Sequence, residues 1–442
     1  MLVPAVNRLR ELLWAVRGSF WLVPAATVLA GVLAALVLIE ADSRLELDLA
    51  QRWPRLFGAG AEGSRAMLSA IASSTITVAG VVFSVTMVTL SLAASSYSPR
   101  VLRTFMHDRP TQAVFGVFVA TFAYSLVVLR TIRGGDEGEG FVPSLAVLGA
   151  VVLALAAVAL LVFFIHHVAV AIQASSILAR IARETEEALD TLFPENLGEG
   201  EDDGEESEGA PPVRGAWRAL PAPRSGYLVA VDTDGLLAFA RSRGAVLRMD
   251  RGIGEFVIQG EPLASLSVER AAEDDAAALG ELYSIAQERT IEQDAGFGVQ
   301  QMVDVGQRSL SPGINDLTTA MMCADHLAAV LVRLARRRMP ARLRYEAGEL
   351  RVVAAGPSFA GLVATAFEPL RRSAEGQAGM LGHLLTNAGR VGCAASAPSR
   401  RRAVAAHVAA LAEAAGRSIG APEDRAALEA QARRLQAELG ER

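Results

Sequence analysis

The chain has 442 residues, which is room for about two or three folded units. Hydrophobic residues make up 52% of it and charged residues 20%, and the net charge is -6, so a disordered chain and a nucleic-acid-binding surface are both poor fits. All of the Lys and Arg positions are arginine, and the absence of lysine excludes a Walker phosphate loop, a Schiff base and a biotin- or lipoate-carrying lysine.

Four apolar stretches are long enough to cross a bilayer, because roughly 20 helical residues span about 30 Å of hydrocarbon. They lie at about residues 20–39, 66–97, 110–130 and 143–172. The first has no small-residue cleavage site of the kind that follows a secretory signal, so we expect a retained anchor. The sequence therefore predicts a transmembrane helical domain over residues 1–193.

The distribution of charge around these stretches predicts their orientation. Arginines lie before the first stretch and between the second and third, whereas the connector between the third and fourth is acidic. Arginine-rich connectors remain in the cytoplasm. We therefore expect both termini to be cytoplasmic. The residues concerned are Arg8, Arg10, Arg17, Arg100, Arg103 and Arg109 on one side and Asp136, Glu137 and Glu139 on the other.

The composition changes abruptly after Pro194, and residues 198–209 contain only Glu, Asp, Gly and Ser. Such a segment cannot bury apolar surface, so a flexible acidic linker is expected over 194–224. Short β-like runs with glycine punctuation follow over 225–268, and mainly helical patterns over 269–442. The predicted fold is membrane α-helical, with four transmembrane helices and a cytoplasmic α+β domain in which a small β-barrel-like module precedes helices.

Parts of the sequence resemble two known kinds of protein. Residues 254–263 resemble the second hairpin of biotinyl- and lipoyl-type barrel modules, without a lysine to modify. The longer resemblance is to a family of predicted bacterial membrane proteins, domain of unknown function 2254. It implies a location in the membrane and no established chemistry. Its motifs are residues 73–84, 98–109, 164–168, 292–294 and 310–316, and it runs over nearly the whole chain.

Small and hydroxyl-bearing residues in the second apolar stretch recur at spacings of three, four or seven. This spacing places them on one face of a helix. In an oligomer the face can line a water-filled path for ions, or it can let helices pack closely. The residues are Ser69, Ser73, Thr77, Gly80, Ser84, Ser91 and Ser95, followed by Ser98.

The apolar cores of the four stretches contain no Asp, Glu or Arg, which favours a passive path over coupled transport. Acidic residues on the connectors predicted to be external can concentrate cations there, or they are ordinary solvated loop charges. They are Asp42, Glu46, Asp48, Asp136, Glu137 and Glu139.

Two adjacent histidines, His166 and His167, close the fourth stretch. Neighbouring side chains point about 100° apart on a helix, so they cannot easily bind one metal ion together. They are candidates for a pH-sensitive gate or for simple packing at the membrane interface.

A mixed group of charged and polar residues precedes the helix predicted to begin at Thr318. It can form a ligand pocket or an intersubunit contact, or it can serve only for ion pairing and helix capping. The residues are Arg289, Glu292, Asp294, Asn315 and Asp316.

No catalytic or metal site is expected. Ser358 follows a predicted strand as a nucleophile would, but no partner histidine is indicated and a helix N-cap explains it more simply. Cys323 and Cys393 are far apart, without Cys-x-x-Cys spacing. We therefore expect no enzyme, no cofactor and no metal.

The leading hypothesis is a homo-oligomeric ion channel or passive pore of the bacterial inner membrane, regulated by its cytoplasmic domain. Its partners would be the lipid bilayer, further copies of the chain and small ions, with no nucleic acid. The alternative is a membrane-anchored ligand-binding, sensory or scaffold protein without a pore.

Overall fold

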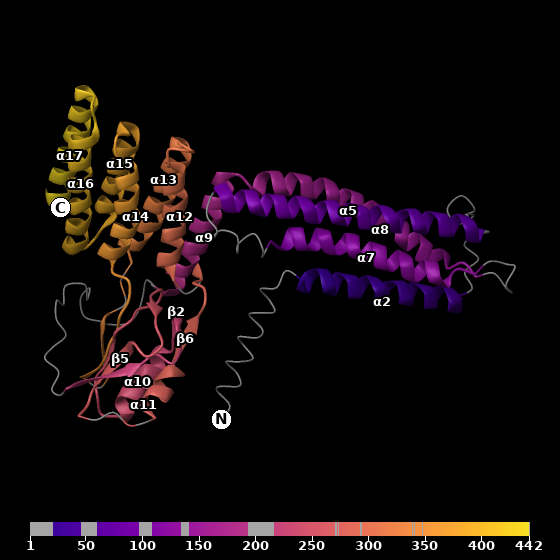
Figure 1. The fold of residues 1–442 in the computed structure, drawn as a ribbon, viewed down its shortest axis with the longest axis horizontal. Coiled ribbons are helices and arrows are strands. Elements are labelled where there is room, and N and C mark those ends of the chain that lie inside the picture. The colour runs from indigo at the N-terminus through magenta and orange to yellow at the C-terminus, as the bar shows by residue number, and fades with distance from the viewer. Residues whose placement is uncertain are drawn as a thin grey trace. The chain divides into compact units, whose positions relative to one another are not determined.

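The computed structural model describes residues 21–45, 60–96, 108–133, 141–192, 216–269, 272, 274–291, 294–337, 339, 341–346 and 348–441. The chain divides into two compact units, Met1–Gln173 and Ala174–Arg442 (Figure 1). Each unit has its own core and is described separately.

Four long helices make up the described part of the first unit: α2 (Leu22–Leu45), α5 (Gly60–Ser96), α7 (Arg109–Thr131) and α8 (Ser144–Ala171). Helix α7 packs against each of the other three and is the most buried of them. Its buried residues include the polar side chains of Gln112, Thr121 and Ser125. The centre of this bundle is therefore partly polar.

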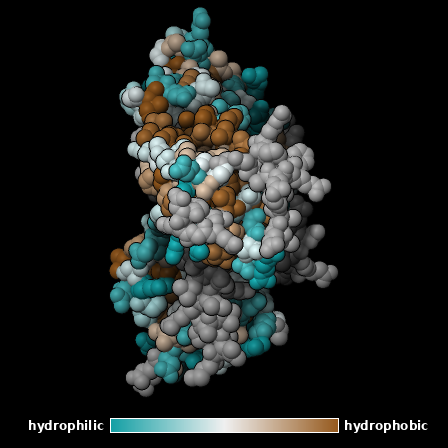
Figure 2. Space-filling model, turned by 90° about the vertical axis from the view of Figure 1, so that its right-hand side faces the viewer, coloured by the Kyte–Doolittle hydropathy of each residue, from teal (hydrophilic) through white to brown (hydrophobic). Residues whose placement is uncertain are grey.

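Small residues let α2 and α7 approach closely. A Cβ atom added at Gly116 of α7 would lie 2.2 Å from Oγ1 of Thr27 on α2, and one at Gly31 would lie 3.2 Å from Cβ of Ala120. Close approach through small residues is the usual way in which membrane helices pack. Much of the outside of the unit is apolar, with exposed side chains such as Leu29, Val88 and Leu155, and part of this surface is visible as brown atoms in Figure 2.

Among the residues that the structure describes, five helices are long and apolar enough to cross a membrane. They are α2, α5, α7 and α8 of the first unit and α13 (Leu317–Ala335) of the second. Helix α13 is half buried among α9, α12, α14 and α15, as the core helix of a globular unit would be. Helix length and composition therefore do not by themselves give the predicted number of four transmembrane helices, and that number stays a prediction.

The helices of the second unit form two rows (Figure 1). One row contains α12 (Ala295–Ser309), α14 (Phe359–Ser373) and α16 (Pro398–Ser418), and the other contains α13, α15 (Ala378–Ala394) and α17 (Pro422–Glu441). Helix α9 (Ala174–Leu192) packs on α12 and α13 at one end of the rows. It lies in the second unit, whereas the sequence pattern predicts a transmembrane domain that extends to residue 193.

The strands of the second unit form two sheets. The first has the order β1 (Trp217–Pro221), β5 (Pro262–Ser267), β3 (Leu247–Met249), β8 (Glu349–Val353) and β7 (Leu343–Glu346). The second has the order β4 (Phe256–Val257), β2 (Gly226–Val231) and β6 (Tyr283–Ala286). Two short helices, α10 (Thr233–Ser242) and α11 (Asp275–Gly280), accompany them. Only β3 and β8 pair in parallel among the described strands.

The expected barrel-like module at residues 225–268 is not confirmed. Strands β4 and β5, which flank the turn at Gly260, belong to different sheets and do not form a hairpin with each other. Strand β8 comes from outside that range, and β1 lies in the range expected to be linker. Pairing between segments distant in sequence leaves no local pattern, which is why strand composition alone suggests a self-contained module.

Candidate functional site

The hydroxyl-bearing face of α5 is exposed on the first unit. Its members Ser69, Ser73, Thr77, Gly80, Ser84 and Ser91 are all exposed, whereas Leu68, Ala72, Thr75, Ala79 and Val82 on the other side of the helix are buried. Ser95 lies in α5, but its side chain is outside the described part, as is all of Ser98. The face is therefore turned away from α2, α7 and α8, and it does not serve to pack helices within one chain.

Two hydroxyl groups of this face donate their protons to their own helix. Thr77 Oγ1 donates to the carbonyl oxygen of Ser73 at 2.7 Å, and Ser73 Oγ donates to that of Ala70 at 3.3 Å. The same bond is made on the buried side, where Thr75 Oγ1 donates to the carbonyl oxygen of Ile71 at 2.8 Å. A hydroxyl oxygen keeps two lone pairs after donating its proton. At Ser73 and Thr77 the exposed face therefore presents hydrogen-bond acceptors.

One carboxylate lies in register with this face. Glu62 is exposed seven residues before Ser69, at the start of α5, and in the described part of the chain it makes no hydrogen bond or ion pair. The nearby Arg65 instead donates to the carbonyl oxygen of Ile132 beyond α7, at 2.8 Å. Sequence reasoning overlooked Glu62 although it continues the heptad spacing of the hydroxyl residues.

Of the acidic residues expected at the outer connectors, the structure describes only Asp42. Its Oδ2 atom accepts hydrogen bonds from the backbone nitrogens of Leu145 and Ala146, at 2.9 and 3.2 Å. The unpaired N–H groups at the start of a helix attract a carboxylate in this way. Asp42 thus holds the start of α8 against α2.

The two histidines of α8 have different surroundings. His166 is exposed, whereas Nε2 of His167 lies 2.8 Å from Oδ2 of Asp108 and its ring stacks on Phe163 with 5.6 Å between centroids. Asp108 also caps α7, because its carboxylate accepts the backbone N–H of Thr111 at 3.2 Å. No group of three or more metal-binding side chains is found among the described residues. His167 therefore joins the end of α8 to the start of α7.

Arg289 and Asp294 form a compact joint at the start of α12. The Oδ2 atom of Asp294 accepts from Nε and Nη2 of Arg289 at 2.8 and 2.6 Å, and Oδ1 accepts the backbone N–H of Phe297 at 3.1 Å. The guanidinium group lies over the Phe297 ring, 5.0 Å from its centroid. A Cβ atom at Gly254, where φ is 90°, would come within 2.4 Å of Asp294 Oδ2. Glu292 lies outside the described residues.

Asp316 is the N-cap of α13. Its carboxylate accepts the side-chain and backbone donors of Thr319 at 2.6 and 3.0 Å, and these bonds lower its pKa below the usual value. Asn315 is exposed with φ of 48°, a conformation that Asn tolerates better than most residues. No described hydrogen bond joins these residues to Arg289 or Asp294, so the candidates of the C-terminal half serve as two separate caps.

Ser358 caps α14. Its Oγ atom accepts the backbone N–H of Gly361 at 3.0 Å, as helix N-cap serines do.

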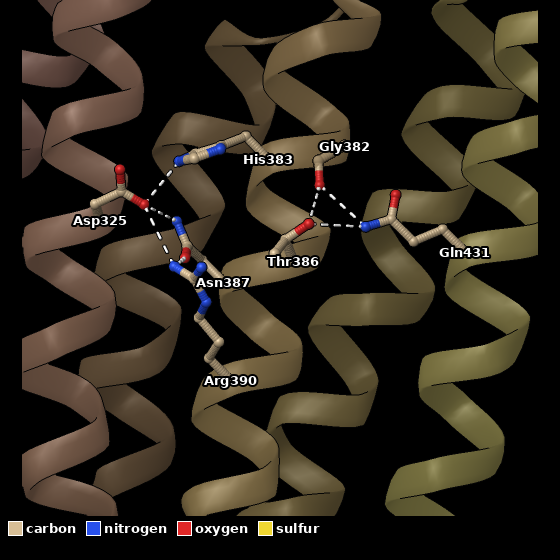
Figure 3. A network of polar contacts seen from close by, with 7 residues as sticks. All are labelled: Asp325, Gly382, His383, Thr386, Asn387, Arg390 and Gln431. Carbon is tan, nitrogen blue, oxygen red and sulfur yellow. Dashed lines mark hydrogen bonds and ion pairs between the residues drawn. The ribbon is translucent and has the colours of Figure 1, made fainter.

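A polar network that sequence reasoning overlooked connects α13, α15 and α17 (Figure 3). Asp325 Oδ1 lies 2.8 Å from His383 Nε2, accepts from Asn387 Nδ2 at 3.0 Å and pairs with Arg390 at 3.7 Å. Gln431 of α17 donates to Thr386 Oγ1 at 2.9 Å. The sequence signal was the spacing of His383, Asn387 and Arg390 along one face of α15. The network joins helices, and with a single carboxylate it resembles no metal site.

Comparison with known proteins gives the family. The model of a family described as predicted membrane protein, DUF2254, matches residues 17–387. The chain belongs to this family. It is 34% identical over 430 residues to the uncharacterized protein MT1328 of Mycobacterium tuberculosis (strain CDC 1551 / Oshkosh), covering 95% of this chain and 81% of that protein. The uncharacterized protein Mb1321c of Mycobacterium bovis (strain ATCC BAA-935 / AF2122/97) is 33% identical over the same share of each chain. No solved structure matches.

Proposed function

We propose that this DUF2254 protein is a homo-oligomeric, passive channel for small cations, in which copies of α5 from several subunits line the path. The observation that carries the proposal is the exposure of the hydroxyl face of α5 on the first unit. A face used for packing within the chain would be buried, as the opposite side of α5 is.

Assembly of several copies follows from the same exposure. A row of hydroxyl groups turned toward lipid is less favourable than one facing water or another protein surface, because hydrocarbon offers no hydrogen bonds. The apolar residues exposed on α2 and α8 are suited to lipid; they include Leu29, Val37, Leu155 and Val162. Contact between copies would therefore be made at α5, and four helices of one subunit would not have to enclose water alone.

The oxygen atoms of this face, together with the Glu62 carboxylate, favour cations over anions. The hydroxyl protons of Ser73 and Thr77 are engaged by carbonyl groups, which leaves oxygen lone pairs to replace water around a cation. Glu62 would add a ring of carboxylates at one mouth of an oligomer, as in many cation channels. With the termini in the cytoplasm of a bacterial inner-membrane protein, this mouth would be the external one.

The decisive experiment compares two threonines of α5. Thr77→Val removes a hydroxyl from the exposed face, and Thr75→Val removes an equally bonded hydroxyl from the buried face. In lipid vesicles with a KCl gradient, we expect the wild type to pass potassium current and Thr77→Val to reduce its conductance severalfold. Thr75→Val should keep the wild-type conductance. Absence of current in the wild type, or equal conductance in both variants, would contradict the proposal.

The second unit supports the alternative of a membrane-anchored binding or sensory protein. It is the larger unit, with two sheets and two rows of helices of its own. Replacing the first unit by an unrelated dimerising anchor separates the two functions. If the protein is a sensor, cells that carry the exchanged form should behave like the wild type. If it is a channel, they should behave like cells that lack the protein.

A further inference from the structure

Strand β7 forms one edge of the five-stranded sheet, and among the described strands it pairs with β8 alone. Such an edge presents N–H and C=O groups that can pair with another chain. The opposite edge, β1, ends in Pro221, which has no N–H to donate, and Arg218 of β1 donates to the carbonyl oxygen of Glu269 at 3.1 Å. Strand β7 contains no proline, and Tyr345 on it is 51% exposed. The edge at β7 is therefore better suited to a partner strand than the edge at β1.

The backbone of β7 is regular, because the extra residue of its bulge with β8 is Arg351, on β8. The carbonyl oxygen of Arg342 accepts the backbone N–H of Ala354 at 2.7 Å, next to β8. Alternate residues of a strand direct their N–H and C=O groups to opposite sides. Even-numbered residues of β7 therefore bond toward β8, and the odd-numbered Leu343 and Tyr345 direct their backbone groups outward.

The side chains next to Tyr345 form a self-complementary pattern of charge. Arg344 precedes it and Glu346 follows it, and because side chains alternate along a strand, these two share the face opposite to Tyr345. Nε of Arg344 and Oε2 of Glu346 have no hydrogen-bond partner among the described residues, although Oε1 of Glu346 accepts from Arg241 at 3.0 Å. Both charged groups therefore keep unused hydrogen-bonding capacity at the edge.

We infer that two copies of the chain join at β7, which pairs antiparallel with β7 of the second copy about a two-fold axis at Tyr345. The outward N–H and C=O groups of the two Tyr345 residues bond to each other across the axis. Arg344 of each copy then lies opposite Glu346 of the other, in a position where side chains come closest and opposite charges attract.

Charge also selects this register over its neighbours. Odd-numbered residues must face each other, because their backbone groups point outward, so the pairing can shift only by two residues at a time. A shift in one direction places Arg344 opposite itself, and a shift in the other places Glu346 opposite itself. Like charges in facing positions are destabilising. The register centred on Tyr345 avoids both contacts.

The inference goes beyond the proposed function and does not depend on it. Pairing at β7 joins the second units of two copies, and this contact suits an anchored sensor as well as a channel. It is also separate from the contact proposed at α5, because β7 belongs to the second unit and α5 to the first.

The first test is a cysteine at the axis, in the full-length protein in membrane vesicles with Cys393 changed to Ser. Two facing Tyr345 residues would have Cα atoms about 5.5 Å apart, which suits a disulfide. Tyr345→Cys should therefore give a disulfide-linked dimer with a copper–phenanthroline oxidant. Arg342→Cys is the control: Arg342 is also exposed, but its two copies would lie roughly 20 Å apart, three residues to either side of the axis.

The second test changes the charges of the Tyr345→Cys chain. Glu346→Arg places arginines opposite each other, so the disulfide should form about tenfold more slowly. The further change Arg344→Glu restores opposite charges in the facing positions and should recover the rate. Glu349→Arg makes the same change of charge on β8, one strand inside the edge, and should leave the rate unchanged.

Three outcomes would overturn the inference: no dimer with Tyr345→Cys, equal dimer formation with Arg342→Cys, or a rate that the exchanged charges do not recover. None of these measurements needs a current. A wild type without current would contradict the proposed function alone, and the disulfide at residue 345 would still decide the inference.

Discussion

Individual carboxylates differ in function because their hydrogen-bond partners differ. Asp42, Asp108, Asp294 and Asp316 each accept backbone N–H groups at the start of a helix. Glu62, in contrast, is exposed and in register with the hydroxyl groups of α5. The first four are expected to affect stability, and Glu62 to affect ion selection.

In the proposed channel, the change Glu62→Gln should reduce the selectivity for cations without blocking the current. It removes the negative charge of the proposed mouth and keeps the size of the side chain, so cations would no longer be concentrated there. We expect the reversal potential in a KCl gradient to move toward zero, and more so at low ionic strength. Glu40→Gln, which neutralises a carboxylate already paired with Arg44, should not move it.

The change Asp316→Ala should loosen the first turn of α13. Loss of an N-cap costs roughly 1 kcal/mol, so amide exchange around Thr319 should become about fivefold faster at neutral pH. The pKa of Asp316 is lowered in the folded state, so its stabilisation is present above the ordinary value of 3.8 and is lost as the pH falls through the lowered pKa. The difference from wild type should therefore shrink in strong acid; a difference that grows there would contradict the assignment.

At the scale of helices, the first unit depends on how closely α7 fits its neighbours. Gly116 and Gly31 place α2 against α7, and Tyr124 Oη donates to the carbonyl oxygen of Ala146 on α8 at 2.8 Å. Such contacts leave little tolerance for added atoms, because packed interiors have few voids.

Gly116→Ala should therefore destabilise the bundle. Its new methyl group would lie 2.2 Å from Thr27 Oγ1, and overpacking of this kind typically costs about 1–3 kcal/mol. Thermal unfolding in detergent should occur at a lower temperature than in the wild type. Gly80→Ala adds the same group where no atom lies within 4 Å, and it should be neutral or stabilising.

At the scale of the whole molecule, the sequence predicted where the helices lie along the chain better than it predicted which helices and strands contact one another. The apolar runs located α2, α5, α7 and α8 closely, and spacing identified which residues of α5 share a face. Spacing cannot say whether that face turns inward or outward, because this depends on contacts with α7 and α8. The pairing of β3 with β8 and the packing of α9 on α12 join residues far apart in sequence, and no local pattern reports them.

Association of several copies of the chain can be tested by cross-linking in the membrane. With Cys393 changed to Ser and Cys323 buried, Ser84→Cys should join two copies through a short bis-maleimide, because helices in contact have axes about 8–10 Å apart. Val158→Cys, on the exposed apolar side of α8, should remain monomeric. Equal cross-linking at both positions would argue against a specific interface at α5.

The buried polar groups of α7 have a consequence for biogenesis. Gln112, Thr121 and Ser125 would meet lipid if this helix left the translocon alone. Since α2 and α5 precede it in synthesis and both contact it in the finished bundle, they can shelter these groups as they emerge, before α8 has been translated. Ribosome-bound chains ending after residue 131 should then hold α7 in the membrane only when α2 and α5 are intact.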